Sequence, residues 1–261
     1  MSGKDNAKSI KMIATDLDGT LLREDKSISD YTRCIINKFR MGGIKFVFAT
    51  GRGTASKVAP EELFDGRITN NGAIAMSGSE VIYNKLIPSQ TARPVLTACS
   101  ERGLRFVSQT GTVHYSNFAV SDIWSWITEF QIVDFANHDL DAEKLYTPDY
   151  LGENKGFIES LLPSDLYTVV TTDITGNIMQ IMNKDATKGK AVLALANHWN
   201  ILPSEIVTFG NDLNDIDMLT SVDLGVAVEN AHDEVIAAAK YVCSSNEEDG
   251  LAKWLEENIL N

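Results

Sequence analysis

The chain has 261 residues, and its 23 Lys and Arg against 36 Asp and Glu leave a formal charge of -13 at pH 7. Binding to the phosphate backbone of nucleic acids depends on clustered Lys and Arg, and a surface this acidic repels nucleic acid and anionic lipid. The composition therefore argues against nucleic-acid and membrane partners and favours a small molecule. With 44% hydrophobic residues the chain supports a packed core, and its length fits one large or two modest domains.

Three cysteines, Cys34, Cys99 and Cys243, lie far apart and form no Cys-x-x-Cys pair. This spacing indicates neither a zinc site nor a disulfide framework, so we expect three buried free thiols. The first eight residues are polar, unlike a secretory signal, and no run of about 18 apolar residues occurs. We therefore expect a cytoplasmic protein.

Short apolar runs alternate with amphipathic stretches at the start of the chain. Residues 12–15 predict a buried strand, and residues 44–49 predict a second one. Between them Ser29 is a suitable N-cap for a helix that Gly42 and Gly43 end. A strand, a helix and a strand with short connections predict a right-handed βαβ unit and a parallel sheet.

The same alternation returns near the C-terminus. It predicts strands at 205–209 and 224–228, with helices at 188–199, at 215–219 and from residue 233. The chain is therefore expected to have an α/β fold with a doubly wound parallel sheet built from both ends of the sequence.

The middle of the chain has a different pattern. Residues 73–83 predict a β-hairpin, and short strands are expected at 105–108, 113–115, 167–170 and 178–182 among mixed helices. We interpret residues 85–185 as an inserted α+β domain. The core would then consist of residues 1–84 and 186–261.

Polar residues follow the first two predicted strands, where open parallel sheets bind their ligands. Asp16 and Asp18 come directly after the first strand. Two such close carboxylates cannot both be buried without neutralisation, which a cation provides; a solvated Asp-Gly turn is the alternative. Thr50-Gly51-Arg52 ends the next strand, where a hydroxyl and backbone amides suit an anion, or form an ordinary turn.

Two further polar segments lie in the C-terminal part. Lys188-Gly189-Lys190 opens a helix, and a lysine at a helix N-terminus opposes the macrodipole. A bound anion explains Lys188, whereas Lys190 is expected in solvent. The segment Gly210-Asn211-Asp212-Leu213-Asn214-Asp215 follows a strand and either offers hard oxygen ligands to Mg2+ or caps the next helix.

In their order, residues 16–21, 50–52, 188–189 and 210–215 resemble the four motifs of the haloacid dehalogenase superfamily, and more narrowly its Cof-type sugar-phosphate phosphatases. Residues 68–73, 225–231 and 246–250 resemble other segments of that branch. The resemblance implies a Rossmann-like core with the insertion as a C2-type cap, which closes over the substrate and sets its specificity.

The resemblance also implies an Mg2+-dependent phosphatase for small phosphorylated metabolites, above all sugar phosphates. Asp16 would attack phosphorus and form an aspartyl-phosphate, and Asp18 would protonate the leaving alcohol and then activate water. The implied phosphate-binding residues are Thr50, Gly51, Lys188 and Asn214. The implied metal ligands are Asp16, Asp18 and Asn211. Supporting roles fall to Asp215, Asp212, Asn71 and Arg52.

One position departs from the family pattern, Gly-Asp-x-x-Asn-Asp. The first Asp, a metal ligand in the family, is Asn211 here, followed by Asp212. An amide oxygen can bind Mg2+ but carries no charge, so weaker metal binding is expected. The alternative is a shifted loop that brings Asp212 to the metal. We take Asn211 as the ligand.

Two rival functions remain open on the sequence. A phosphosugar mutase is one, because the related phosphomannomutases share the Asp-x-Asp start and the cap type. A non-catalytic phosphometabolite-binding protein is the other, motivated only by Asn211. In the insertion, Trp124 and Trp126 either contact a sugar ring or pack in the core. The four histidines, His114, His138, His198 and His232, show no metal-ligand spacing.

Overall fold

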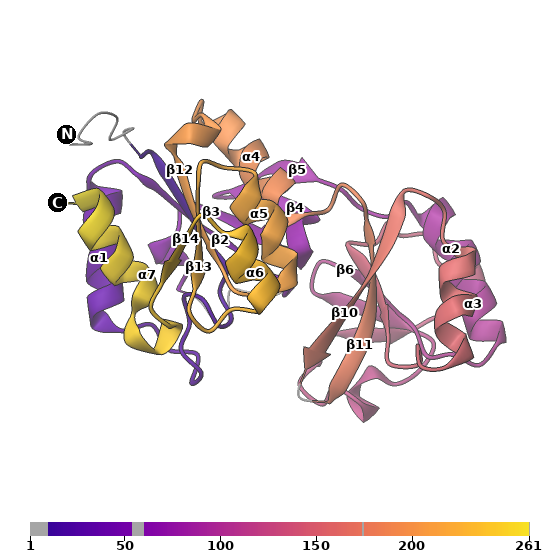
Figure 1. Cartoon of the computed structure of the whole chain (residues 1–261). Helices are drawn as coiled ribbons and strands as arrows, with labels where there is room; N and C mark the ends of the chain where they lie inside the picture. The colour runs from indigo at the N-terminus through magenta and orange to yellow at the C-terminus, as the bar shows by residue number, and fades with distance from the viewer. Residues whose placement is uncertain (1–9, 54–59, 174, 261) are drawn as a thin grey trace. The chain divides into compact units, whose positions relative to one another are not determined.

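The computed structural model describes residues 10–53, 60–173 and 175–260, which form two compact units (Figure 1). One unit comprises Met1–Asn84 and Thr187–Asn261, and the other comprises Lys85–Ala186. The first unit therefore resumes at Thr187, one residue later than the expected boundary. The polar start of the chain falls in residues 1–9, outside the described residues. None of the helices in the described ranges has both the length and the apolar character to cross a bilayer.

The first unit contains an eight-stranded sheet in the order β14-β13-β12-β1-β2-β3-β4-β5. The six strands from β14 to β3 are parallel, and β4 and β5 form an antiparallel hairpin at the edge. Their bounds are β1 Met12–Thr15, β2 Lys45–Ala49, β3 Gly66–Thr69, β4 Ile74–Ser77, β5 Glu80–Asn84, β12 Ile206–Gly210, β13 Leu224–Val228 and β14 Tyr241–Cys243. The predicted doubly wound α/β fold is confirmed.

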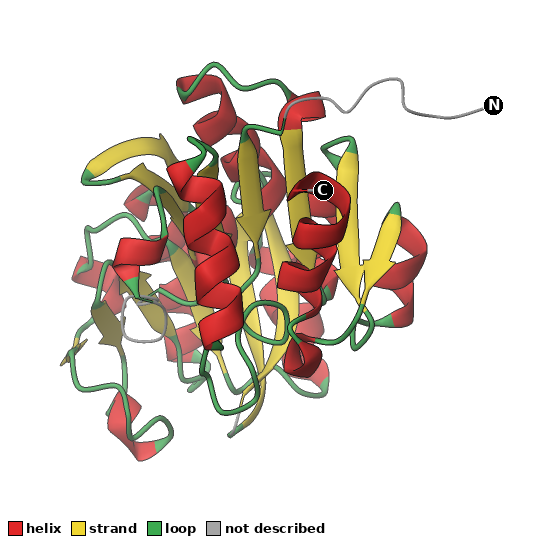
Figure 2. Ribbon diagram, turned by 90° about the vertical axis from the view of Figure 1, so that its left-hand side faces the viewer, coloured by secondary structure: helices red, strands yellow, loops and turns green. Residues whose placement is uncertain are grey.

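Helices cover both faces of this sheet, as Figures 1 and 2 show. They are α1 Asp30–Met41, α4 Lys188–His198, α5 Ile216–Thr220, α6 Asp233–Ala238 and α7 Gly250–Leu255. Helices α1 and α7 pack on one face and α4 and α5 on the other. Strand β1 supplies Ile13 to the first core and Met12 to the second, because successive side chains of a strand point to opposite faces.

Helix α1 begins and ends where the sequence predicts. The Ser29 side chain accepts a hydrogen bond from the Thr32 amide, and Gly42 is the C-cap. Ile35, Ile36 and Phe39 are buried on one side of the helix. Cys34 lies on the exposed side, so the expectation of three buried thiols is wrong for Cys34, although Cys99 and Cys243 are buried.

The second unit is built on a six-stranded sheet in the order β10-β11-β9-β6-β7-β8. Its strands are β6 Val107–Thr110, β7 Val113–Ser116, β8 Phe130–Ile132, β9 Lys144–Thr147, β10 Leu166–Asp173 and β11 Gly176–Asn183. Helices α2 Ser89–Glu101 and α3 Glu153–Leu161 pack on one face of it (Figure 1). The strand expected at 105–108 starts two residues later, because the Arg105 amide is held by the Asp149 side chain outside the sheet.

Short 3-10 turns connect the elements of both units. In the first unit they are η2 Glu61–Leu63, η3 Asn70–Gly72, η6 Pro203–Glu205, η7 Leu213–Asp215 and η8 Asn246–Glu248. In the second unit they are η4 Val120–Asp122 and η5 Phe135–Asn137. A π-helical segment, Glu256–Leu260, follows α7. Among these turns, η3, η7 and η8 carry residues of the polar segments identified in the sequence.

Gly72 provides a test of how closely the loops of the first unit pack. Its φ is +100°, and a Cβ added there would lie 2.2 Å from the Thr187 carbonyl oxygen. Gly43 has a φ of +84° with open space around it. Both Ala variants are strained by φ, but only Gly72→Ala also overpacks its surroundings. We expect Gly72→Ala to lose about 2 kcal/mol more unfolding free energy than Gly43→Ala, measured by urea denaturation; equal losses would contradict this packing.

Candidate functional site

The candidate site lies at the carboxyl ends of the central strands of the first unit. Asp16 follows β1, Thr50 follows β2 and Asn211 follows β12. Strand β1 lies between β2 and β12. Helix α1, which follows β1, packs on one face of the sheet, and α5, which follows β12, packs on the other. The connections after β1 and β12 therefore run to opposite sides at this point. Such a switch point is where open α/β sheets bind ligands.

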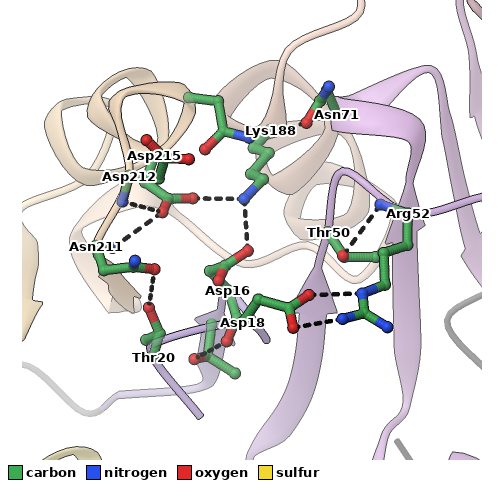
Figure 3. Close-up of polar contacts among 12 residues, drawn as sticks. Asp16, Asp18, Thr20, Thr50, Arg52, Asn71, Lys188, Asn211, Asp212 and Asp215 are labelled. Atoms are coloured by element: carbon green, nitrogen blue, oxygen red, sulfur yellow. Dashed lines mark hydrogen bonds and ion pairs between the residues drawn. The ribbon is translucent and has the colours of Figure 1, made fainter. Parts of the chain in front are cut away.

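Lys188, the first residue of α4, lies between two carboxylates (Figure 3). Its Nζ is 2.6 Å from Asp16 Oδ1 and 2.7 Å from Asp215 Oδ1, and all three side chains are buried. Burial lowers the pKa of a lysine, but the two carboxylates outweigh burial and raise the pKa of Lys188 above its ordinary value. Burial also raises the pKa of Asp16 to about 7, against the opposing charge of Lys188. Lys188 therefore holds a fixed positive charge beside Asp16.

Asp215 connects Lys188 to the loop that follows β12. Its Oδ2 accepts hydrogen bonds from the backbone amides of Asn211 at 2.9 Å and Asp212 at 3.0 Å. A carboxylate bound to two amides and an ammonium is strongly held. Asp215 therefore fixes both the ammonium group of Lys188 and the conformation of the loop carrying Asn211.

Asp18 is bound by two cations. Arg52 Nε and Nη2 each lie 2.6 Å from one Asp18 oxygen, and Lys26 Nζ lies 2.9 Å from Oδ1. Burial raises the pKa of Asp18, but the hydrogen bonds and charges of Arg52 and Lys26 outweigh burial and lower it. The sequence suggested Arg52 as a supporting residue; no pattern in the sequence marks Lys26.

The two candidates for the variant metal position have different surroundings. Asn211 Oδ1 accepts a hydrogen bond from the Thr20 hydroxyl at 2.8 Å. A Cβ added to Gly19 would lie 2.7 Å from the side-chain nitrogen of Asn211. The Asp212 side chain is half-exposed, binds the Leu213 amide at 2.7 Å and lies 3.5 Å from His232. Asn211 thus packs against the loop that carries Asp18, and Asp212 caps the next turn (Figure 3).

The loop after β3 contacts both the loop that carries Asn211 and the loop after β2. Asn214 Nδ2 donates to Asn71 Oδ1 at 2.9 Å, and the Asn71 backbone amide donates to the Thr50 carbonyl at 3.0 Å. Asn71 adopts a left-handed backbone conformation with a φ of 56°. A Cβ on Gly51 would lie 2.8 Å from Asn71 Oδ1, so Gly51 allows this close approach. The structure therefore brings Thr50, Gly51, Asn71 and Asn214 together.

The first turn of α4 is already bound by protein groups. Thr187 is the N-cap and accepts a hydrogen bond from the Lys190 amide, while Asp217 Oδ2 accepts one from the Gly189 amide at 2.9 Å. Lys190 is exposed, as expected. The helix therefore contributes its Lys188 side chain to the site, and its Gly189 amide binds Asp217.

Three residues near the C-terminus fasten the loop that carries Asp18. Asn230 Nδ2 donates to the Gly19 carbonyl and Asn246 Nδ2 to the Leu22 carbonyl, both at 2.8 Å. The backbone amide of Asn246 donates a hydrogen bond to Asn230 Oδ1 at 3.1 Å. Asp249 accepts hydrogen bonds from Arg23, Ser29 and Thr32. The sequence marked the segments of Asn230, Asn246 and Asp249 only by resemblance, and the structure gives them a physical role.

The oxygen atoms near Asp16 are of the kind that Mg2+ prefers. Among the residues described, no cluster of three His, Cys, Asp or Glu forms a metal site. The candidate donors are instead the Asp16 carboxylate, the Asp18 main-chain carbonyl and the Asn211 side-chain oxygen. Mg2+ is usually held by one or two carboxylates and keeps several waters, so this donor set suits Mg2+ better than a thiolate- or imidazole-binding metal.

Comparisons with known proteins agree with this geometry. A family model described as haloacid dehalogenase-like hydrolase matches residues 13–255. A Haemophilus influenzae protein is 31% identical over 95% of this chain and 98% of its own length. The 5-amino-6-(5-phospho-D-ribitylamino)uracil phosphatase YcsE of Bacillus subtilis is 29% identical over 96% of each chain.

A solved structure extends the likeness to both units of the chain. It is that of BT4131, described as a sugar phosphatase of subclass IIB of the same superfamily. The TM-score is 0.77 at 25% sequence identity, with 95% of this chain and 98% of that chain covered. The core and the inserted unit are therefore both part of the similarity.

Asn246 tests the fastening of the Asp18 loop. Asn246→Ala leaves the buried Leu22 carbonyl without its donor, which costs about 1–3 kcal/mol. We expect faster amide hydrogen exchange at Leu21 and Leu22, measured by mass spectrometry or NMR. Asn258→Ala is the control, because Asn258 donates to the Trp254 carbonyl within the C-terminal helical segment. Unchanged exchange at Leu21 and Leu22 in the folded Asn246→Ala variant would show that Asn246 does not hold the loop.

Proposed function

This chain belongs to the Cof-type haloacid dehalogenase-like hydrolases, which makes it a phosphoric monoester hydrolase, and from that membership we propose that it hydrolyses small sugar phosphates through an aspartyl-phosphate. The observation that carries the proposal is the buried Asp16 at the carboxyl end of β1, 2.6 Å from Lys188. A carboxylate beside a fixed cation can receive an anionic phosphoryl group that would otherwise repel it.

The reaction we propose has two steps that balance in atoms and protons. An Asp16 oxygen attacks phosphorus and forms the acyl-phosphate bond while the bond to the ester oxygen breaks, and Asp18 gives its proton to the leaving alcohol. A water then attacks the same phosphorus and gives a proton to Asp18. Inorganic phosphate leaves and Asp16 returns as a carboxylate.

Asp18 must release its contacts to act as this acid. Its two oxygens bind Arg52 and Lys26, and both cations favour the charged form of the carboxylate. We propose that this arrangement is the resting state and suits the second step, in which a carboxylate accepts the proton of water. When the substrate displaces at least one of these cations, the pKa of Asp18 rises and its carboxyl takes up a proton from solvent for the first step. The proton that Asp18 gains from water in the second step returns to solvent as the cations bind again.

The phosphoryl oxygens would be held by the groups around Asp16. Lys188 supplies a charge, the Thr50 hydroxyl and the Gly51 amide supply donors, and the Asn214 amide supplies a further donor. The transition state of phosphoryl transfer is stabilised mostly by such positioned charges and dipoles. The close contact of Asn71 with Asn214 supports this grouping.

We propose Mg2+ as the cofactor, held by Asp16, the main-chain carbonyl of Asp18 and Asn211. When bound it would screen the charge between Asp16 and the anionic substrate. Asp215 then has a double role, since it fixes Lys188 and also the loop of Asn211.

The proposed substrate class rests on two similar proteins. BT4131 is described as a sugar phosphatase, and YcsE is described as acting on a phosphorylated ribityl compound. Both descriptions name a phosphate ester on a sugar or sugar-alcohol chain. We propose that the second unit, Lys85–Ala186, is the cap that selects among such esters.

Asp16→Asn tests the chemistry. The amide is nearly isosteric but not nucleophilic, so we expect turnover to fall at least about 1,000-fold while the melting temperature changes little. The assay measures phosphate release from a panel of phosphorylated metabolites with Mg2+. Stoichiometric release of phosphate and free alcohol by the wild type excludes a mutase. Wild-type turnover in the Asp16→Asn variant would refute the nucleophile, and an inactive wild type on every ester would favour a binding protein.

Asn211→Asp tests the metal site. A second formal charge next to Asp16 should tighten Mg2+ binding about tenfold, measured by calorimetric titration of the substrate-free protein. Asp212→Asn is the matched control and should leave Mg2+ affinity unchanged. Weaker Mg2+ binding in Asp212→Asn, with no gain in Asn211→Asp, would instead assign the ligand role to Asp212.

A further inference from the structure

Lys26 has an unusual backbone conformation in the turn that follows the Asp18 loop. Its φ is 67°, in the left-handed region where a side chain crowds the backbone. Glycine, asparagine and aspartate are the usual residues in this region. Glycines aside, the other described residues with a positive φ are Asn70, Asn71, Asn200 and Asp249. A lysine is therefore not the residue that this turn alone would favour.

Hydrogen bonds on both sides hold the turn in this conformation. The Lys26 backbone amide donates to the Arg23 carbonyl at 2.9 Å, and the Arg23 amide donates to the Ser27 carbonyl at 3.1 Å. The Ser27 amide donates to Asp25 Oδ1 at 2.8 Å, and Arg23 Nη2 lies 2.9 Å from Asp249 Oδ2. None of these bonds uses the side chain at position 26. Strained backbone that its surroundings enforce is typical of functional positions, so we look to the side chain for the reason.

The Lys26 side chain makes one of three hydrogen bonds to the Asp18 carboxylate. Lys26 Nζ and Arg52 Nη2 both donate to Oδ1, at 2.9 Å and 2.6 Å, and Arg52 Nε donates to Oδ2 at 2.6 Å. A carboxylate oxygen has about two acceptor sites. The donors of the described residues therefore occupy both sites of Oδ1 and one site of Oδ2. Lys26 thereby determines which oxygen of Asp18 can accept a further hydrogen bond.

The stability of the fold does not account for this ion pair. Lys26 and Asp18 are both partly exposed, and exposed ion pairs add little to the stability of a protein. A lysine in the left-handed region subtracts from that stability. The ion pair therefore brings the fold little gain, which points to a role for the lysine in the reaction of Asp18.

We propose that Lys26 is a positioning residue for the second step of the reaction, the hydrolysis of the aspartyl-phosphate on Asp16. By holding Oδ1, Lys26 fixes the Asp18 carboxylate with Oδ2 as the oxygen that accepts the proton of the attacking water. Correct placement of a catalytic group accounts for a large part of its effect. The inference rests on the proposed function and adds to it the residue that prepares Asp18 for water.

The first step does not depend on Lys26. In that step the substrate displaces a cation from Asp18, and the one bond of Lys26 breaks more easily than the two parallel bonds of Arg52. Once Asp18 has given its proton to the alcohol it is a carboxylate again and can bind Lys26. Removal of the lysine should therefore slow the second step alone.

The test follows the two steps separately with p-nitrophenyl phosphate and Mg2+ on the full chain. Release of p-nitrophenolate reports the first step, and acid quenching with mass spectrometry measures the fraction of phosphorylated Asp16. We expect Lys26→Met to release the first equivalent of p-nitrophenolate as fast as the wild type. Its steady-state turnover should then fall about tenfold while phosphorylated Asp16 accumulates.

Two variants are the matched controls. Arginine can reach Asp18 from the same turn, so Lys26→Arg should restore most of the turnover lost in Lys26→Met. Lys38 is an exposed lysine of α1 whose Nζ lies 3.6 Å from Glu256 Oε1. Lys38→Met removes an equal charge that is paired elsewhere in the first unit, and it should keep the wild-type turnover.

Lys26→Asn separates the role of the side chain from that of the turn. Asparagine accepts the left-handed backbone but is too short to reach Asp18. We expect its urea midpoint to equal or exceed that of the wild type, although its turnover falls as in Lys26→Met.

Two results would overturn the inference. One is hydrolysis of phosphorylated Asp16 at the wild-type rate in Lys26→Met. The other is a lower urea midpoint in Lys26→Asn together with a turnover that Lys26→Arg does not restore, which would assign the lysine to the fold alone. A wild type that phosphorylates Asp16 with neither this ester nor any ester of the panel refutes the proposed function, and the inference falls with it. Normal phosphorylation with unchanged hydrolysis in Lys26→Met refutes the inference alone, so the two failures are distinguishable.

Discussion

The buried contact of Lys188 with Asp16 and Asp215 is the constraint on which the rest of the first unit depends. One ammonium serves two carboxylates, and all three side chains are withdrawn from water. Removal of one member of such a group leaves an uncompensated buried charge, which costs about 3–5 kcal/mol. The contact therefore joins β1, the start of α4 and the turn after β12 in one arrangement, and it holds only while all three elements are in place.

The close packing around this contact explains the small residues nearby. A Cβ on Gly210 would lie 2.5 Å from the Asp215 Cβ, and one on Gly189 would lie 2.7 Å from the Asp217 carbonyl oxygen. A larger residue at Gly210 would displace the Asp215 turn, and one at Gly189 would push α5 away from α4. The distance between Lys188 and Asp215 is thus maintained by backbone segments that lie almost in contact, in addition to the attraction between the charges.

Local patterns in the sequence were enough to predict the helices and strands of the first unit and to identify the polar residues that follow its strands. Periodicity and caps located β1, α1 and β13 because those signals act over a few residues, as Ser29 illustrates. The residues after the strands converge because parallel strands end at the same edge of the sheet. Their individual roles came from the family resemblance, and they remain proposals.

Contacts that depend on distant parts of the chain could not be predicted in this way. Lys26 reaches Asp18 from a turn whose course is set by packing, and Asn246 reaches Leu22 across 224 residues of sequence. The exposed position of Cys34 depends on which side of α1 meets the sheet.

The fastening of the Asp18 loop by Asn230, Asn246 and Asp249 has a consequence for how the protein is made. The residues that hold this loop are synthesised more than 200 positions after it, and β1 also pairs with the late strand β12. A nascent chain therefore carries Asp16 and Asp18 on an unsupported loop until Asn230 and Asn246 have been synthesised. Contacts of such long sequence separation form slowly, so the loop of Asp16 and Asp18 becomes ordered only after Asn246 and Asp249 have been synthesised.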